Sequence, residues 1–133
     1  MRHLNIIAVL FIALYFTSCS EDIAVTDFSG TYVGPLNCVG PVHEENGTEA
    51  IFIITKTEED RYTLDIGDDI TYTAVQEGDL LKVSKQTANE GNGFDEVTFE
   101  GDITKTDLGI EAIFSVSVDD DGSSSCDMQL SKQ

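Results

Sequence analysis

The sequence of 133 residues predicts an all-β fold, a single antiparallel up-and-down barrel of about eight strands. Behind an apolar leader, apolar and polar residues alternate in short runs, which is the period of a half-buried strand. Gly, Asp and Asn interrupt these runs roughly every 8 to 12 residues, a spacing typical of β-sandwiches and barrels. No helical period of similar length competes. A two-sheet β-sandwich built from the same strands is the alternative.

The first four strands are expected at residues 31–39, 49–57, 61–66 and 70–75. A polar loop that contains Gly40-Pro41 and Asn46-Gly47 separates the first two. Each strand has apolar residues at alternate positions or in one solid run, so each has a face suited to a core. In order, these residues are Tyr32, Leu36 and Cys38; Ile51 to Ile54; Tyr62, Leu64 and Ile66; and Ile70, Tyr72 and Ala74.

The last four strands are expected at residues 80–86, 95–105, 109–118 and 124–131. The third of these shows the clearest alternation in the chain. The last three of these strands have aligned apolar residues. In order, these are Val97, Phe99 and Ile103; Ile110, Ala112, Phe114, Val116 and Val118; and Cys126, Met128 and Leu130. The short connections at 58–60, 67–69, 77–79 and 119–122 suit hairpin turns. Consecutive hairpins form a meander, and closing it into a barrel removes its exposed edges.

The amino-terminal residues have the layout of a signal peptide, with Arg2 before the uncharged run 6–16. That run is too short to span a bilayer comfortably, because a transmembrane helix needs about 20 apolar residues. The next residues, Ser18-Cys19, resemble the lipobox of bacterial lipoproteins, although Phe16 stands where leucine is usual. The resemblance implies removal of residues 1–18 and lipid attachment to Cys19. Residues 19–26 would then be a tether, and residues 27–133 the β domain.

The resemblance also bears on location. The step Ser20-Glu21-Asp22 resembles the acidic signal that sends some lipoproteins of gram-negative bacteria to the outer face of the outer membrane. We therefore expect a lipid anchor in the outer membrane, on its periplasmic or its cell-surface side. The alternative is ordinary signal-peptidase cleavage after Ser20, which would discard Cys19 and release an exported, untethered protein.

Three cysteines are an odd number for an exported chain. Lipidation of Cys19 leaves Cys38 and Cys126, which can form a disulfide in the oxidising envelope. In an eight-strand meander the first and last strands are antiparallel, so the end of one lies beside the start of the other. Cys38 and Cys126 occupy those places, and the expected disulfide would join the closing seam of the barrel. Two buried free thiols are the alternative.

The formal charge of −18 excludes nucleic acid as a partner, because binding to phosphates depends on Lys and Arg. Removal of residues 1–18 takes away Arg2 alone among the charged residues, leaving 6 basic and 25 acidic residues and a charge of −19. Such a surface favours cationic or neutral partners. The simpler interpretation is that these acids keep a surface protein soluble.

The segment Phe28-Ser29-Gly30-Thr31-Tyr32 resembles the Gly-x-Trp segment that opens the lipocalin (calycin-like) barrel, with Tyr32 in the place of tryptophan. Small lipocalin-like lipoproteins of gram-negative bacteria share this start. The family usually packs an arginine from the last strand over that tryptophan, and no arginine follows Arg61 here. The resemblance implies a small apolar ligand in the barrel. The short domain equally allows an interior filled by its own side chains.

No catalytic motif stands out. The chain has no Gly-x-Ser-x-Gly elbow and no His-Glu-x-x-His, and His43 is the one histidine behind the leader, so we expect no enzyme and no cofactor. A metal site is not expected either. The turn Asp119-Asp120-Asp121-Gly122 has carboxylates suited to Ca²⁺, but an EF-hand alignment puts Ser117 and Met128 at its two key ligand positions.

The sequence therefore leaves two alternative functions. The first is a lipid-anchored module that binds a small apolar molecule inside the barrel, among the inward-facing aromatic side chains. These are Tyr32, Tyr62, Tyr72, Phe99 and Phe114. The second is a surface interaction or inhibitor module, or an accessory subunit of an outer-membrane assembly, that acts on a cationic protein through its acidic exterior.

Overall fold

A computed structural model of the chain describes residues 26–42, 44–67, 70–89, 96–118 and 122–133. The predicted signal peptide, Cys19 and most of the tether lie outside these residues, as do His43 and the acidic residues 119–121. No helix in the described part of the chain is long and apolar enough to cross a membrane.

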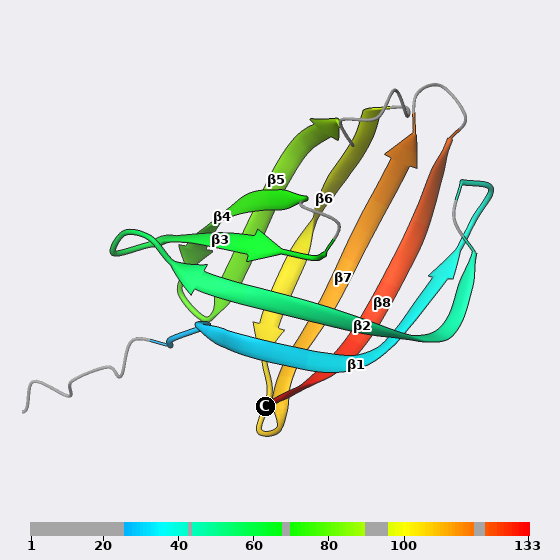
Figure 1. Cartoon of the computed structure of the whole chain (residues 1–133). Helices are drawn as coiled ribbons and strands as arrows, with labels where there is room; N and C mark the ends of the chain where they lie inside the picture. The colour runs from blue at the N-terminus through cyan, green and yellow to red at the C-terminus, as the bar shows by residue number, and fades with distance from the viewer. Residues whose placement is uncertain (1–25, 43, 68–69, 90–95, 119–121) are drawn as a thin grey trace, which may run out of the picture.

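Eight antiparallel strands form one closed barrel in chain order (Figure 1). The strands are β1 (Gly30–Val39), β2 (Glu45–Lys56), β3 (Arg61–Asp65), β4 (Thr71–Glu77), β5 (Leu80–Asn89), β6 (Glu96–Lys105), β7 (Gly109–Val118) and β8 (Ser123–Lys132). Strand β1 pairs with both β2 and β8, so the sheet has no open side edge at the seam between first and last strands. The predicted up-and-down barrel is confirmed, and the sandwich alternative is not adopted.

Two strands, β2 and β5, run at least three residues further than the sequence predicted. Strand β2 begins at Glu45 rather than Glu49, because Glu45 and Asn46 pair with β1 beyond a bulge at Gly47 instead of forming a loop. Gly47 has φ of +75°, and its N–H donates to Oδ1 of Asn37 at 3.1 Å. Strand β5 runs to Asn89 past a second bulge, between Val83 and Gln86. Bulges of this kind bend a strand, which helps a sheet curl into a barrel.

The core is the set of inward-facing side chains from all eight strands, joined by Phe28 from before β1. Glycines on the same faces let the wall curve. A Cβ on Gly101 would lie 2.3 Å from the carbonyl oxygen of Ile113 and from Cδ1 of Phe114, and a Cβ on Gly34 would lie 2.4 Å from the carbonyl oxygen of Gln129. Neither glycine could carry a side chain without moving backbone of the next strand.

The predicted disulfide is present. Cys38 and Cys126 are register partners across the β1–β8 seam, and their sulfurs are bonded. Both residues are buried. The link therefore joins the two strands that close the barrel, as the parity of the cysteines and the strand order predicted.

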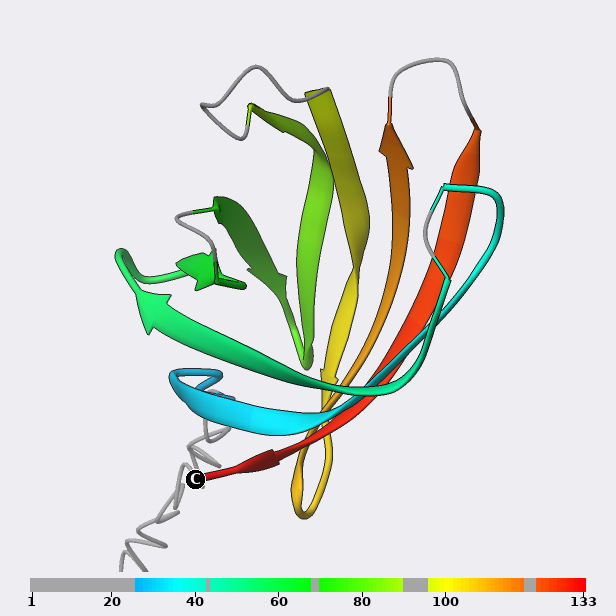
Figure 2. The same cartoon turned by 45° about the vertical axis from the view of Figure 1, so that its right-hand side comes forward.

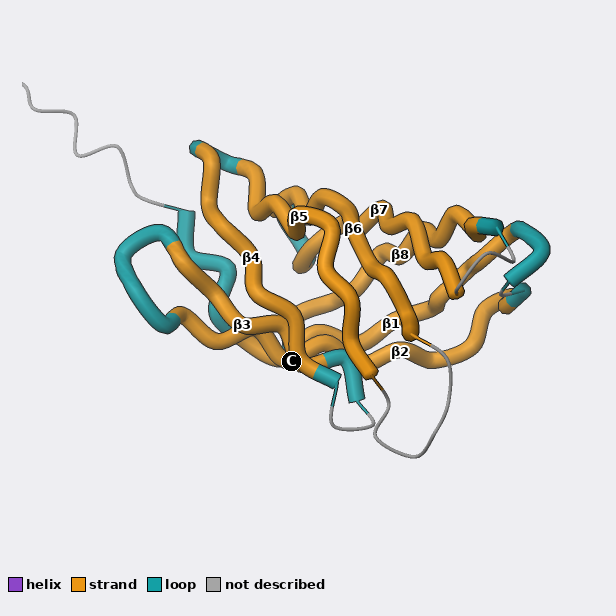
Figure 3. The backbone as a smooth tube through the Cα atoms, turned by 90° about the horizontal axis from the view of Figure 1, so that it is seen from above, coloured by secondary structure: helices purple, strands orange, loops and turns teal. Residues whose placement is uncertain are grey.

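The barrel has two different ends. The connections β2–β3, β4–β5 and β6–β7 lie at the end where the described chain starts, and the strand ends on the opposite side form what we call the mouth. Strands β3 and β4 have 5 and 7 residues, against 10 to 12 for the others. Consequently the β3–β4 hairpin ends well below the tips of β5 to β8 (Figure 2). Seen from above, this hairpin forms one side of the ring (Figure 3).

Candidate functional site

The end opposite the mouth is sealed by the segment that precedes β1. Phe28 is fully buried, and its ring packs edge-on against Tyr62, with 6.0 Å between centroids. Gln76 donates to the carbonyl oxygen of Thr26 at 2.8 Å, and the Thr26 hydroxyl donates to Asp79 at 2.6 Å. These bonds hold the segment across the barrel, so Phe28 acts as a plug.

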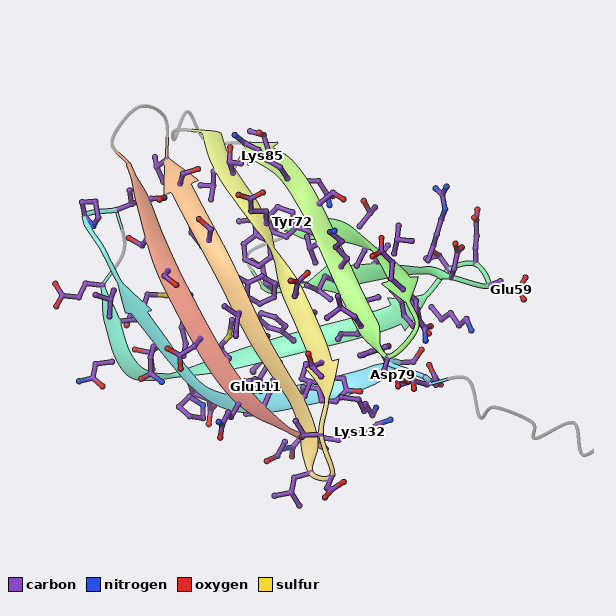
Figure 4. All side chains as sticks on the ribbon, turned by 180° about the vertical axis from the view of Figure 1, so that it is seen from behind. Glu59, Tyr72, Asp79, Lys85, Glu111 and Lys132 are labelled. Atoms are coloured by element: carbon purple, nitrogen blue, oxygen red, sulfur yellow. A yellow bond between two sulfur atoms is a disulfide. The ribbon has the colours of Figure 1, made fainter. Side chains whose placement is uncertain are left out.

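Two lysines complete the seal around Tyr32. Its hydroxyl donates to the carbonyl oxygen of Phe28 at 2.8 Å and accepts from Lys105 Nζ at 3.0 Å. Lys105 Nζ also donates to the carbonyl oxygen of Asp27 at 2.9 Å, and Lys132 Nζ donates to that of Ser29 at 2.8 Å. Both ammonium groups lie over the Tyr32 ring, at 5.4 and 5.9 Å from its centroid, within the range of cation–π attraction. Figure 4 shows Lys132 at this end of the barrel.

The turn before β1 is fixed by a carboxylate. The backbone N–H of Ser29 donates to Oδ1 of Asp27 at 2.9 Å. This hydrogen bond favours the charged carboxylate and holds the pKa of Asp27 below its ordinary value of 3.8. The segment that contains the plug residue Phe28 is therefore held by a hydrogen bond that is strongest when Asp27 is ionised.

A chain of aromatic rings crosses the middle of the barrel. Tyr72 stacks on Phe99 with centroids 4.5 Å apart, Phe99 contacts Phe114 at 4.2 Å, and Phe114 contacts Phe52 at 5.6 Å. All four side chains are buried. Figure 4 shows Tyr72 inside the wall, whereas the labelled Lys85 and Glu111 lie on the outside. These rings touch one another, so they fill the middle of the barrel and form a floor beneath the mouth.

Above this floor the inward-facing side chains are apolar but only partly buried. Leu36, Ala50, Ile66, Ile70 and Val116 pack against the core in this way. They come from β1, β2, both sides of the β3–β4 turn, and β7. Ser124 on β8 is buried instead, because the backbone of Val42 donates to its Oγ at 3.1 Å and covers it. These five partly buried apolar residues lie toward the mouth, above the aromatic floor, and we call this set the cup.

The wall beside the cup is closed by a side chain. Strands β4 and β5 pair only between residues 75–77 and 80–82, and then diverge. Above that point the Gln86 amide takes the place of a neighbouring strand: its Oε1 accepts from the backbone N–H of Thr73 at 2.8 Å, and its Nε2 donates to the Thr73 carbonyl oxygen at 2.5 Å. The Thr73 hydroxyl also donates to Oε1, at 2.9 Å. Gln86 therefore satisfies both backbone groups of Thr73 at this seam.

The outside of the barrel has a hollow. It is a shallow groove of about 350 Å³ across β5 to β8. The outward side chains that line it include Lys82, Glu100, Asp102 and Ile113, the last of which is 55% exposed. Among the described residues, no group of three or more His, Cys, Asp or Glu side chains is placed to hold a metal ion.

The five aromatic residues predicted to line a ligand site fall into two groups. Tyr72, Phe99 and Phe114 form the floor of the cup, whereas Tyr32 and Tyr62 belong to the sealed end and contact the plug. Alternation predicted that all five face inward, but it carries no signal for height along the barrel axis. The partly exposed Ile66 and Ile70 were assigned to the core face of their strands and were not recognised as site residues.

No protein-family model matches this chain, and searches of curated proteins and of solved structures found no similar protein.

Proposed function

We propose that the protein is an exported, lipid-anchored binding module that takes up an apolar ligand in the cup at its mouth, and that it has no catalytic activity. One observation carries this proposal. The barrel is plugged at one end by the fully buried Phe28, while its other end presents partly exposed apolar side chains above an aromatic floor. Small-molecule sites are lined mainly by apolar and aromatic side chains, and the mouth of a β-barrel is one of their usual places.

The lipid anchor fits this arrangement. The described chain starts at Thr26, which is bonded to Asp79 and Gln76 at the sealed end. Residues 19–25 extend the chain by at most about 25 Å. An anchor at Cys19 would keep the sealed end toward the membrane, and the mouth would face away from it and be open to ligands.

The lysines over Tyr32 support the resemblance to lipocalins. That family packs an arginine from the last strand over a tryptophan, and here Lys132 of β8 lies over Tyr32, at the position of the tryptophan. A search for arginine alone could not have found this pair. It is a lysine version of the same cation–aromatic contact.

Native mass spectrometry of the protein, extracted from its own envelope in mild detergent, tests whether a ligand is bound. We expect an added mass that is retained by the native chain and by Ile113→Gln, and lost by Ile70→Gln. Ile113 is the matched control because it is also an isoleucine but lies on the outer face. A chain that carries no added mass, or equal retention by both variants, would contradict the proposal.

The anchor has its own test. Metabolic labelling with a fatty acid should mark the native chain and leave Cys19→Ala unlabelled. Equal labelling of the two chains would remove the anchor from the proposal without affecting the cup.

An interaction module that acts through its acidic exterior, alone or as a subunit of an outer-membrane assembly, is the second candidate. The outer groove favours it, because Glu100 and Asp102 flank the exposed Ile113 there. Capture of a cationic protein should then weaken with added salt and with the double substitution Glu100→Gln and Asp102→Asn. Capture that is unaffected by both changes would reject this candidate.

A further inference from the structure

Strand β2 extends beyond the strand that should cover its second edge. It pairs with β1 from Glu45 to Ile54, but with β3 only from Ile53 to Lys56. Strand β3 ends at Asp65, and the chain turns away after Ile66. In the described part of the chain, residues 46–52 of β2 therefore have no strand partner on the side away from β1. Every second residue of such an edge presents an N–H and a C=O that can pair with another strand.

This edge lies beside the cup. Ala50 and Phe52 point into the barrel, where Ala50 packs against the core and Phe52 is part of the aromatic floor. Figure 2 shows β2 continuing to the right beyond the β3–β4 hairpin, and β3 pairs with it only from Ile53 to Lys56. A strand added here would lie in line with β3 and would complete the wall of the barrel, with alternate side chains in the cup.

The outward face of the edge is also apolar. Ile51 and Ile53 are 49% and 44% exposed, and Val33 of β1 is the register partner of Ile51. Natural edge strands are usually protected by charges, proline, bulges or a covering segment. Between 48 and 52 the only charge on this edge is Glu49. From Ala50 to Ile53 the edge is apolar on both faces, and such a stretch is suited to pairing with another strand.

We infer that an extended segment of another polypeptide pairs with β2 over residues 48–52, beyond the bulge at Gly47. This inference rests on the proposed function, because it names the class of ligand for the same mouth. The paired backbone would provide affinity, and alternate side chains would provide specificity, as in other cases of strand addition. The segment carries apolar side chains on its inward positions. Outward, it carries neutral or basic side chains, because Glu49 and Asp65 flank the edge on that face.

A second copy of this chain is a less favourable partner for the β2 edge than a neutral or basic segment. Pairing two β2 edges would bring together two molecules that each carry a charge of about −19 without the leader, and would place Glu49 near its own copy. A neutral or basic segment has no such repulsion.

The test uses three seven-residue peptides of alternating valine and lysine with blocked ends, whose binding is measured by fluorescence anisotropy. One is unmodified, and the other two are N-methylated on one or the other set of alternate residues. Only one set of N–H groups can face β2, so one methylated peptide should bind roughly tenfold to a hundredfold more weakly than the unmodified peptide. The other should bind almost as well as the unmodified peptide. Equal binding of the two methylated peptides would overturn strand addition.

Two variants give the matched protein control. Ile51→Lys places a charge on the edge and should weaken binding of the unmodified peptide, whereas Ile113→Lys makes the same change on the outer face of the barrel and should not. Binding should also slow hydrogen exchange at amides within 48–52. Equal effects of the two lysine variants, or no protection of these amides, would contradict the assigned edge.

The neutral probe N-phenyl-1-naphthylamine separates this inference from the proposed function. If the probe binds in an Ile70→Gln-sensitive manner while the peptides fail to protect β2, strand addition is wrong and the apolar cup stands. If neither the probe nor any peptide binds, both proposals are wrong. Binding of both ligands, each excluding the other, is the expected result.

Discussion

The disulfide at the barrel seam should account for a large part of the stability of this small domain. Cys38 and Cys126 are separated by 88 residues, so the bond constrains nearly the whole unfolded domain. The chain-entropy relation for a loop of this size gives about 4.6 kcal/mol at 25 °C. For a domain of about 107 residues this corresponds to a fall of about 20 °C in the melting temperature when the bond is lost.

The assay compares the oxidised chain, the same chain after reduction, and the double variant Cys38→Ala with Cys126→Ala. Urea unfolding is followed by far-ultraviolet circular dichroism. The reduced chain keeps both sulfur atoms in the core, so its decrease in the free energy of unfolding reports the loss of the disulfide bond alone. The alanine variant should lose slightly more stability, because it also lacks the two sulfur atoms. A loss below about 1.5 kcal/mol in the reduced chain would refute the loop-closure reasoning, because it would mean that the unfolded chain gains little freedom without the bond.

Three further predictions concern the sealed end and the seam beside the cup. Gln86→Leu removes the amide that bonds Thr73, so hydrogen exchange at the Thr73 amide should accelerate at least roughly tenfold with a loss of about 1 kcal/mol of stability; an unchanged exchange rate would contradict the role of Gln86. Lys105→Met removes two charge-assisted bonds and the cation–π contacts with Phe28 and Tyr32, and should cost about 1.5 to 3 kcal/mol in urea unfolding, whereas the exposed Lys82→Met should cost almost nothing; similar costs would reject the network. The pKa of Asp27 is lowered in the folded state, so its contribution is present above the unfolded value near 3.8 and is lost as pH falls below it; the native chain should therefore lose more stability than Asp27→Asn between about pH 4 and pH 2, and equal losses would contradict the assigned hydrogen bond.

The sequence contained most of the fold because alternation has a direct physical cause. A strand with one face in the core must alternate, and β7 was predicted with the bounds Gly109–Val118 that it has. The pairing of Cys38 with Cys126 followed from parity and strand order. Neither argument needed a relative of known structure.

The differences occur where a strand departs from ideal geometry. Asn46-Gly47 is a strong turn signal, yet Gly47 is accommodated in β2 with a positive φ after a bulge. Gln86 was predicted as the end of a strand, and the bulge before it instead turns its amide toward Thr73. Bulges have no simple sequence signature, so the start of β2 was predicted too late in the chain and the end of β5 too early.

The site was harder to predict than the fold. Phe28 is a single apolar residue between polar neighbours, and no periodicity marks it as a plug. Tyr32 and Tyr72 have the same inward orientation, but one lies at the sealed end and the other below the cup. Height along the axis depends on strand tilt and register, which only the three-dimensional structure gives.

The central claim is that the mouth, and not the outer wall, is the binding surface. Amide shift mapping by nuclear magnetic resonance with N-phenyl-1-naphthylamine tests it most directly. The account predicts shifts at Ala50, Ile66, Ile70 and Val116 and none at the plug residue Phe28. Shifts concentrated on the outer groove across β5 to β8, with the cup residues unchanged, would contradict it.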